Sequence, residues 1–144
     1  MMDQRSAIRI VVADDCGPDV ILIEETLRTA GLQVELTVFP DGEACAGYLK
    51  SNAPPPAAIL LDLNLPRLDG FELLTLVRAD PRYAGVPVAV LTSSRLAADK
   101  QKSLELGANA FITKPGTLDA FLDTVGSAIH ELLGRKTAKT QHAR

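Results

Sequence analysis

The chain has 144 residues, of which 47% are hydrophobic and 23% charged, so it is long enough for one domain with its own core and has ordinary globular composition. No apolar run approaches the roughly 20 residues of a membrane-spanning helix, and the first residues lack the apolar segment of a signal peptide, so we expect a cytoplasmic protein. The net charge is −3, and four basic residues lie in the last ten positions, which leaves an acidic body that argues against non-specific binding to nucleic acids.

Short apolar runs alternate with amphipathic segments along the chain. Runs rich in β-branched residues that end at turn residues are typical of buried strands. Apolar residues that recur every three or four positions, between a capping residue and a glycine, indicate helices. The pattern predicts strands over residues 7–13, 33–39, 59–62, 86–91 and 110–113 and helices over residues 18–30, 41–50, 71–79, 96–106 and 118–132. The fourth of these helices has the thinnest apolar face, so we expect it to be the most mobile.

A strand followed by a helix, repeated five times, is typical of a parallel sheet with helices on both faces. The second strand alternates polar and apolar residues as an edge strand does, whereas the other four are typical of buried strands. We therefore predict the α/β class, with a flavodoxin-like five-stranded parallel sheet of order 2-1-3-4-5. Residues 1–134 are expected to form this single domain, and residues 135–144 are expected to be a disordered basic tail.

Polar side chains follow four of the predicted strands. Carboxyl ends of parallel strands meet at one edge of a sheet, and in this strand order the first and third strands are neighbours there. We therefore expect the polar residues at these four strand ends to converge. They are Asp14 and Asp15 after the first strand, Asp62 at the end of the third, Thr92 after the fourth and Lys114 after the fifth.

Three carboxylates in one place repel one another unless a cation neutralises them. Mg²⁺ prefers oxygen ligands and often binds one or two carboxylates together with phosphate, and Lys114 adds a compact positive charge. A carboxylate can attack phosphorus and form an acyl phosphate, and phosphoryl transfer otherwise needs mainly positioning and neutralisation of the oxygens. We therefore predict that Asp62 is a phosphoryl acceptor, assisted by Mg²⁺, Lys114 and the Thr92 hydroxyl.

These motifs together resemble the receiver domain of two-component response regulators over about residues 7–133. The segment DLNLPRLDG, which contains Asp62, and the connector over residues 81–85 are most similar to those of stand-alone receivers that are paired with hybrid or phytochrome-type kinases. The resemblance rests on Asp14-Asp15, on Asp62 within LLDLNLPRLDG, on Thr92 within VAVLTSS and on Lys114-Pro115 within AFITKP.

The resemblance implies a phosphorelay function. Asp62 would receive its phosphoryl group from a phosphohistidine of a sensor kinase or of a histidine phosphotransfer protein, in a Mg²⁺-dependent reaction. The chain would catalyse only its own phosphorylation and dephosphorylation. The implied metal ligands are Asp14, Asp15, Asp62 and the backbone carbonyl of Asn64, and the implied phosphoryl contacts are Thr92 and Lys114.

The output implied by the resemblance is a change in a protein-binding surface. Phosphorylation would draw Thr92 inward, the switch aromatic Phe111 would follow, and the face formed by the fourth helix, fifth strand and fifth helix would be reshaped. The Lys114–Pro115 peptide bond is expected to be cis. No DNA-binding domain follows the last predicted helix, so the expected partners are proteins: a histidine kinase, with hybrid and phytochrome-type kinases as candidates, or a histidine phosphotransfer protein. The chain itself would be a monomer or a homodimer.

Three other functions can be compared with the residues of this chain. A phosphatase of the haloacid-dehalogenase class also uses an aspartyl nucleophile, but it needs a second acid two residues later, where this chain has Asn64. A flavodoxin-like flavin carrier needs a phosphate-binding loop after the first strand, where Asp14 and Asp15 would repel a phosphate. A phosphorylation-independent adaptor with the receiver fold stays open, because only an experiment separates it from the switch.

Overall fold

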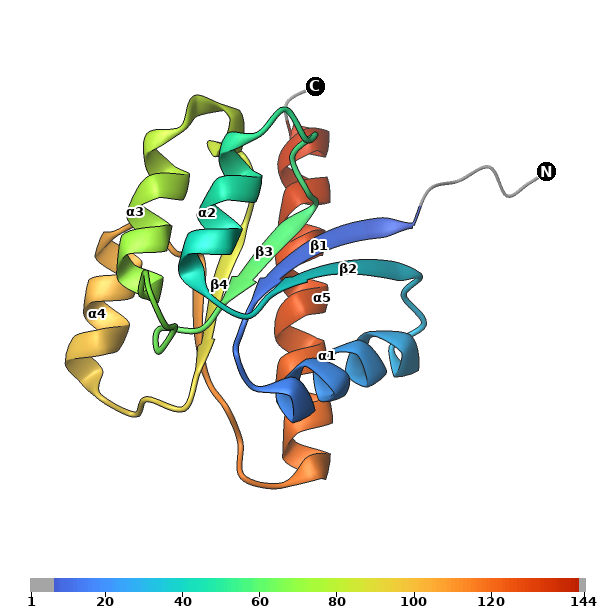
Figure 1. Ribbon diagram of the computed structural model, residues 1–144. Coiled ribbons are helices and arrows are strands. Elements are labelled where there is room, and N and C mark those ends of the chain that lie inside the picture. The colour runs from blue at the N-terminus through green and yellow to red at the C-terminus, as the bar shows by residue number, and fades with distance from the viewer. Residues whose placement is uncertain (1–6, 143–144) are drawn as a thin grey trace.

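The computed structural model describes residues 7–142, with side chains up to Gly134. Five parallel strands form one sheet in the order β2-β1-β3-β4-β5, as Figure 1 shows, so the predicted class and strand order are confirmed. The strands are β1 (Ile8–Ala13), β2 (Val34–Phe39), β3 (Ala58–Leu61), β4 (Val88–Thr92) and β5 (Ala110–Thr113).

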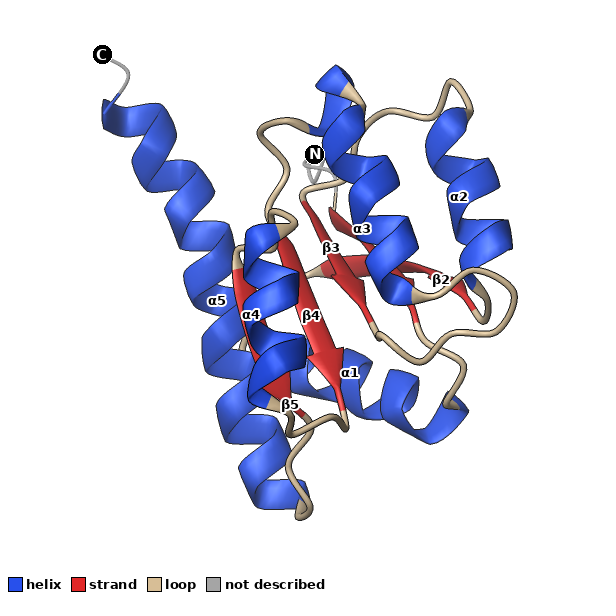
Figure 2. Ribbon diagram, turned by 90° about the vertical axis from the view of Figure 1, so that its left-hand side faces the viewer, coloured by secondary structure: helices blue, strands red, loops and turns tan. Residues whose placement is uncertain are grey.

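Helices cover both faces of this sheet. The helices are α1 (Gly17–Thr29), α2 (Gly42–Lys50), α3 (Gly70–Ala79), α4 (Ala97–Glu105) and α5 (Leu118–His142), with a short 3₁₀ turn, η1 (Pro81–Tyr83), after α3. Figures 1 and 2 show α1 and α5 on one face and α2, α3 and α4 on the other. All five predicted helices are present, and their first residues agree with the predicted ones closely.

The core consists of two apolar clusters separated by the sheet. Successive strand residues point to opposite faces, so Val11 and Ile59 pack with residues of α2 and α3, whereas Ile10 and Leu60 pack with residues of α1 and α5. Every residue of β3 is buried. Burial on both faces fixes the register of this strand, and it therefore fixes where its polar successor, Asp62, stands.

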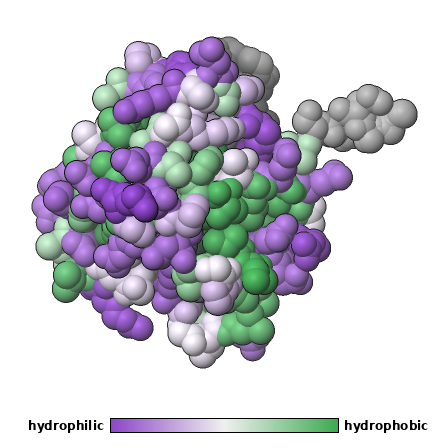
Figure 3. Space-filling view, viewed as in Figure 1, coloured by the Kyte–Doolittle hydropathy of each residue, from purple (hydrophilic) through white to green (hydrophobic). Residues whose placement is uncertain are grey.

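Strand β2 lies at the edge of the sheet, as its alternating pattern predicted. It pairs with β1 alone, and apolar surface gathers over β2 and α1 in Figure 3. Ile21 of α1 and Val38 of β2 are among the exposed large apolar residues. An unpaired edge with few charges is a place where another chain can dock.

The start of α3 is packed tightly against the end of β3. Asp69 caps α3 and forms a capping box with Glu72, and the Gly70 N–H donates to the Leu63 carbonyl at 3.0 Å. A Cβ on Gly70 would lie 2.7 Å from the Leu63 Cα and nearer still to the Asp62 carbonyl oxygen. Only glycine therefore fits here without a shift of the backbone that carries Asp62.

The end of the sheet opposite these loops is held by Arg78 of α3. Its guanidinium donates to the Gly107 carbonyl at 2.9 Å, the Tyr83 carbonyl at 2.8 Å and the Asn109 side chain at 2.9 Å. Burial lowers the pKa of Arg78, but its five donors suit such a set of oxygens. Arg78 thus links α3 and η1 to the loop that follows α4.

Two expectations differ from the structure. Helix α5 continues to His142, well beyond the predicted end at Leu132, because no proline interrupts a segment rich in good helix formers. The expected disorder of residues 135–144 stays a prediction, and the side chains and last two residues of this segment lie outside the described residues. The prediction of a cis Lys114–Pro115 bond was wrong, because the described residues contain no cis peptide bond. The trans form is lower in energy by roughly 0.5–1 kcal/mol.

Within residues 7–142, no helix has the length and apolar character that crossing a membrane requires.

Candidate functional site

Three carboxylates meet at the carboxyl ends of β1 and β3. The two strands are direct neighbours, with Ala13 opposite Leu61, and the Asp62 N–H donates to the Ala13 carbonyl at 2.9 Å. Oxygen atoms of Asp14, Asp15 and Asp62 all lie within 4.8 Å of one another. The predicted convergence of these acids is therefore observed, with Asp14 and Asp62 buried and Asp15 exposed.

Lys114 reaches the same place from the end of β5. Its backbone N–H donates to the Thr92 carbonyl at 2.7 Å, which fixes the base of the side chain beside β4. Its ammonium lies 2.9 Å from the Asp14 carboxylate and 3.0 Å from the Asp62 carboxylate, and its side chain is 10% exposed. Burial lowers the pKa of Lys114, but hydrogen bonds to Asp19 and to Asp14 outweigh that effect and raise it. Lys114 is therefore a permanent cation at any ordinary pH.

Backbone N–H groups hold the two buried carboxylates in place. The Cys16 N–H donates to Asp14 Oδ1 at 2.9 Å, and the Asn64 N–H donates to Asp62 Oδ1 at 3.1 Å. Burial raises the pKa of Asp14, and the hydrogen bond from Cys16 together with the nearby ammonium offsets this only in part. One oxygen of each carboxylate is thus fixed by the backbone, and the other faces the lysine.

The hydroxyl of Thr92 stands at the end of β4, in a fully buried residue. Ser94, two residues further along the loop, connects β4, α4 and β5. The Ser94 N–H donates to Thr92 Oγ1 at 3.4 Å, the Ser94 hydroxyl donates to Asp99 of α4 at 2.6 Å, and the Ser94 carbonyl accepts from Thr113 of β5 at 2.9 Å. Ser94 thus links Thr92 both to the first turn of α4 and to the residue before Lys114.

Phe111, the expected switch aromatic, is half-buried on β5 and packs against the cluster on the α2 and α3 side of the sheet. Helix α4 next to it buries little: Ser103 is its buried residue, and Leu104 is exposed. The sparse apolar face that the sequence indicated for this helix is therefore observed. Its greater mobility stays a prediction.

The donor set of the acid cluster fits a hard divalent cation. All candidate ligands are carboxylate oxygens, and neither histidine nor cysteine is part of the group. Mg²⁺, Mn²⁺ and Ca²⁺ prefer oxygen ligands of this kind. Lys114 pairs with Asp14, Asp19 and Asp62, and Asp15 lies close to Asp14 and Asp62. Among the described residues of this cluster, four carboxylates therefore stand beside one ammonium, and negative charge is left for a metal ion to neutralise. The part of the backbone carbonyl of Asn64 in such a site stays a prediction.

Asp19 was missed by the sequence reasoning. It lies in the first turn of α1, and its Oδ2 is 2.7 Å from the ammonium of Lys114. The only available signal was an acid in the first turn of a predicted helix, and such acids are common because the helix dipole favours them.

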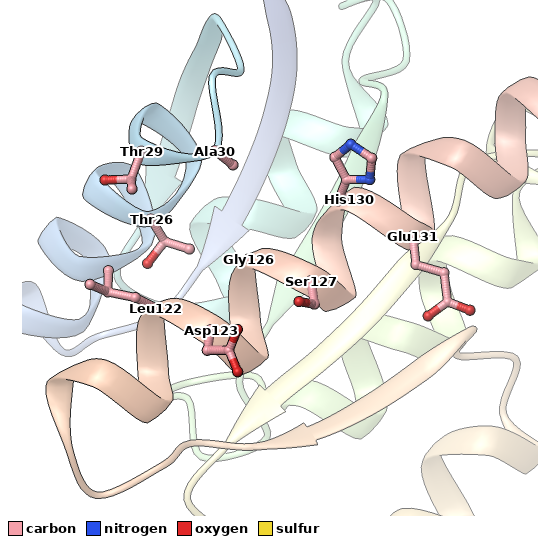
Figure 4. A pocket seen from close by; sticks show the side chains of 9 residues that line it. All are labelled: Thr26, Thr29, Ala30, Leu122, Asp123, Gly126, Ser127, His130 and Glu131. Carbon is pink, nitrogen blue, oxygen red and sulfur yellow. The ribbon is translucent and has the colours of Figure 1, made fainter.

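A surface pocket of about 570 Å³ lies elsewhere, between α1 and α5, as Figure 4 shows. The two helices approach each other closely beside it, where a Cβ on Gly126 would lie 3.0 Å from the Thr26 methyl group. The side chains that line it include His130, Asp123 and Glu131, each exposed to solvent. It contains none of the acids that converge at the strand ends, so we place the functional site at the acid cluster.

Comparison with known proteins gives the same family. A family model described as the response regulator receiver domain matches residues 10–126. Response regulator Rcp1 of Synechocystis sp. is 38% identical over 114 residues, which are 76% of this chain and 78% of Rcp1. The resemblance that the motifs indicated is thereby confirmed.

Solved structures agree with the match in fold. The phosphorylated cyanobacterial phytochrome response regulator RcpA has a TM-score of 0.82 at 33% identity, over 89% of this chain and 95% of RcpA. The Mn²⁺-bound form of Rcp1 has a TM-score of 0.77 at 35% identity, over 83% and 89%. The receiver domain of the Pseudomonas aeruginosa sensor histidine kinase PA1611, with a magnesium ion coordinated in its active site cleft, has a TM-score of 0.70 at 26% identity, over 90% and 99%. With five parallel strands in the receiver order and the acids and lysine at their ends, the chain belongs to the response regulator receiver domain family.

Proposed function

We propose that this chain is a phosphorylation switch in a two-component phosphorelay. Asp62 accepts a phosphoryl group from a phosphohistidine of a sensor kinase or of a histidine phosphotransfer protein, and the acyl phosphate changes a surface that binds another protein. One observation carries the proposal: the ammonium of Lys114 lies 3.0 Å from Asp62 Oδ2, beside a cluster of carboxylates at the carboxyl edge of the sheet.

The reaction is a displacement at phosphorus. An oxygen of the Asp62 carboxylate forms the new P–O bond while the P–N bond to the donor imidazole breaks. The imidazole leaves with the electron pair of that bond and takes up a proton from solvent. Lys114 neutralises one phosphoryl oxygen, and the Thr92 hydroxyl donates to another, so the residues supply positioning and charge rather than a proton.

The metal site would use Asp14, Asp15 and Asp62, together with the backbone carbonyl of Asn64. Bound Mg²⁺ would neutralise these carboxylates and one oxygen of the incoming phosphoryl group. The support is the all-oxygen donor set within 4.8 Å, and the relatives Rcp1 and PA1611 bind Mn²⁺ and magnesium respectively. Without neutralisation, a dianionic donor would meet four carboxylates and a single ammonium, which is an unfavourable encounter.

The switch would run through the loop after β4. When the Thr92 hydroxyl turns to the phosphoryl group, its contact with the Ser94 N–H is lost, and Ser94 also holds Asp99 of α4 at 2.6 Å. Phe111 would move with Thr92. The output face is then α4, β5 and α5, and the change is a shift in population between two states. The sparse packing of α4 supports this choice.

The partners that we propose are proteins. A histidine kinase donates the phosphoryl group, and a phytochrome-type kinase is favoured because RcpA, which matches over 89% of this chain, is a phytochrome response regulator. A histidine phosphotransfer protein is the other donor. The chain acts only on its own acyl phosphate, works in the cytoplasm, and is a monomer or a homodimer. The competing function is a receiver-fold adaptor that never carries phosphate.

Intact mass after incubation with acetyl phosphate tests the proposal. Wild type should gain one phosphoryl group with Mg²⁺ and none with EDTA, and hydroxylamine should remove the group as it removes acyl phosphates. Asp62→Asn should gain nothing, while Asp123→Asn, which changes an exposed acid of α5, should behave as wild type. The adaptor would be supported instead if wild type gained no phosphate from acetyl phosphate and none from a phosphorylated phytochrome-type kinase.

A further inference from the structure

We propose that Asp19 is a positioning residue for phosphoryl transfer, which acts by holding the ammonium of Lys114 over Asp62. This inference rests on the proposed function. Asp19 Oδ2 lies 2.7 Å from Lys114 Nζ, the shortest of the three ion-pair distances that the ammonium makes. The side chain of Asp19 is 24% exposed and that of Lys114 is 10% exposed, so the pair is only partly screened by water.

The geometry matches the donors of an ammonium group. Lys114 Nζ carries three N–H groups, and three carboxylates lie at hydrogen-bonding distance: Asp19 at 2.7 Å, Asp14 at 2.9 Å and Asp62 at 3.0 Å. These carboxylates come from α1 and from the positions directly after β1 and β3. The ammonium is therefore fixed by three contacts from different elements, and hydrogen bonds between charged partners are stronger than neutral ones.

Asp19 is the one of the three carboxylates that lies outside the group that fits a metal ion. Asp14 and Asp62 both belong to the group that fits a metal ion, and Asp19 does not. Each of the two also accepts a backbone N–H on its second oxygen. A bound cation and the new P–O bond draw on Asp14 and Asp62, so their hold on the lysine weakens at the moment of transfer. The hold of Asp19 does not.

The position of Asp19 on α1 makes it a rigid anchor. It lies in the first turn of the helix, directly after Pro18, whose ring fixes its own backbone φ at the helix start. Its carboxylate therefore has a defined origin relative to β1. During transfer, one N–H of Lys114 turns from Asp62 to a phosphoryl oxygen. The contact with Asp19 then keeps the ammonium at the site, where it would otherwise move toward water or toward another carboxylate.

The test measures phosphorylation by acetyl phosphate at saturating Mg²⁺, by intact mass sampled over many hours. Asp19→Ala should be about tenfold slower than wild type, which corresponds to about 1.4 kcal/mol. Asp19→Asn should be about threefold slower, because its amide oxygen still accepts a hydrogen bond. Asp119→Asn is the matched control, since it changes an exposed first-turn acid of α5, and it should stay within twofold of wild type.

A double-mutant cycle separates positioning from a structural effect. If Asp19 acts through Lys114, Asp19→Ala should change the rate less than twofold in a Lys114→Ala background. The same four proteins are also unfolded in urea with EDTA, where the effect of Asp19→Ala on the unfolding constant should differ about tenfold between the two backgrounds.

Three results would overturn the inference. The first is an Asp19→Ala rate within twofold of wild type. The second is an equal loss of rate in both backgrounds, together with equal effects on urea unfolding, because the residue would then support the fold and not the lysine. The third is a wild type that takes no phosphoryl group at all, which removes the proposed function and this inference together. The wild-type arm therefore distinguishes a failure of the function from a failure of the role of Asp19.

Discussion

A single methyl group on Gly70 should damage both the stability and the chemistry of this protein. A Cβ there would lie 2.7 Å from the Leu63 Cα and nearer still to the Asp62 carbonyl oxygen, whereas carbon atoms in contact prefer about 3.5–4.0 Å. Because the obstacles are backbone atoms, the segment that carries Asp62 must move by about 1 Å. Overpacking of this kind costs about 1–3 kcal/mol, and the better helix propensity of alanine returns at most about 1 kcal/mol.

We therefore expect Gly70→Ala to lower the free energy of unfolding by about 1–2 kcal/mol. With a urea m-value of about 1–3 kcal/mol/M, the midpoint should fall by roughly 0.3–2 M. A displacement of about 1 Å at the acceptor can cost about a hundredfold in rate, so phosphorylation by acetyl phosphate should slow by about that factor. Circular dichroism in urea and intact mass over time measure the two effects.

Gly47→Ala is the matched control, because Gly47 is exposed in the middle of α2 and nothing lies within 4 Å of a Cβ there. This variant should gain about 0.5–1 kcal/mol in stability and should keep the wild-type rate. The two glycines thus give opposite signs for the same chemical change. A Gly70→Ala protein that is as stable as Gly47→Ala and is phosphorylated at the wild-type rate would refute the reasoning from close backbone packing.

Other parts of the chain give three further predictions. Tyr83→Phe removes a buried hydrogen bond to the Leu49 carbonyl. Because Arg82 also donates to that carbonyl, the free energy of unfolding in urea should fall by only about 1 kcal/mol. A fall of more than about 3 kcal/mol would contradict this. Burial raises the pKa of Cys45 to about 12, so its thiolate is scarce at pH 8 and a disulfide reagent should label the half-buried Cys16 first, with Cys16→Ser removing the fast phase. Ser94→Ala removes the bond to the first turn of α4, and amide exchange there should rise about tenfold; unchanged exchange would argue against that link.

The residues at the strand ends of the functional site could be predicted from the sequence, because the strand order of a parallel sheet determines where its strand ends lie. Each of Asp14, Asp62, Thr92 and Lys114 follows a run of apolar residues, and parallel strands bring such ends to one edge. The observed register and distances agree with that expectation. No pairwise contact had to be known in advance.

The contacts made by side chains from helices could not be predicted in this way. Asp19 sits where the helix dipole alone favours an acid, so its sequence context does not distinguish a cap from a partner of Lys114. Arg78 has the same ambiguity, since a basic residue in the last turn of a helix also suits the dipole. Its three acceptors lie up to 31 positions away in the sequence, and only the fold brings them together.

The position of β1 between β2 and β3 has a consequence for synthesis. This strand is made before both of its partners, β2 and β3, and the lysine of the site, Lys114, directly follows β5. A nascent chain on the ribosome therefore carries the three acids of the cluster long before it carries their counter-charge. Because long-range parallel pairing forms late, we expect incomplete chains to lack the assembled cluster of acids and lysine and to be poor phosphoryl acceptors.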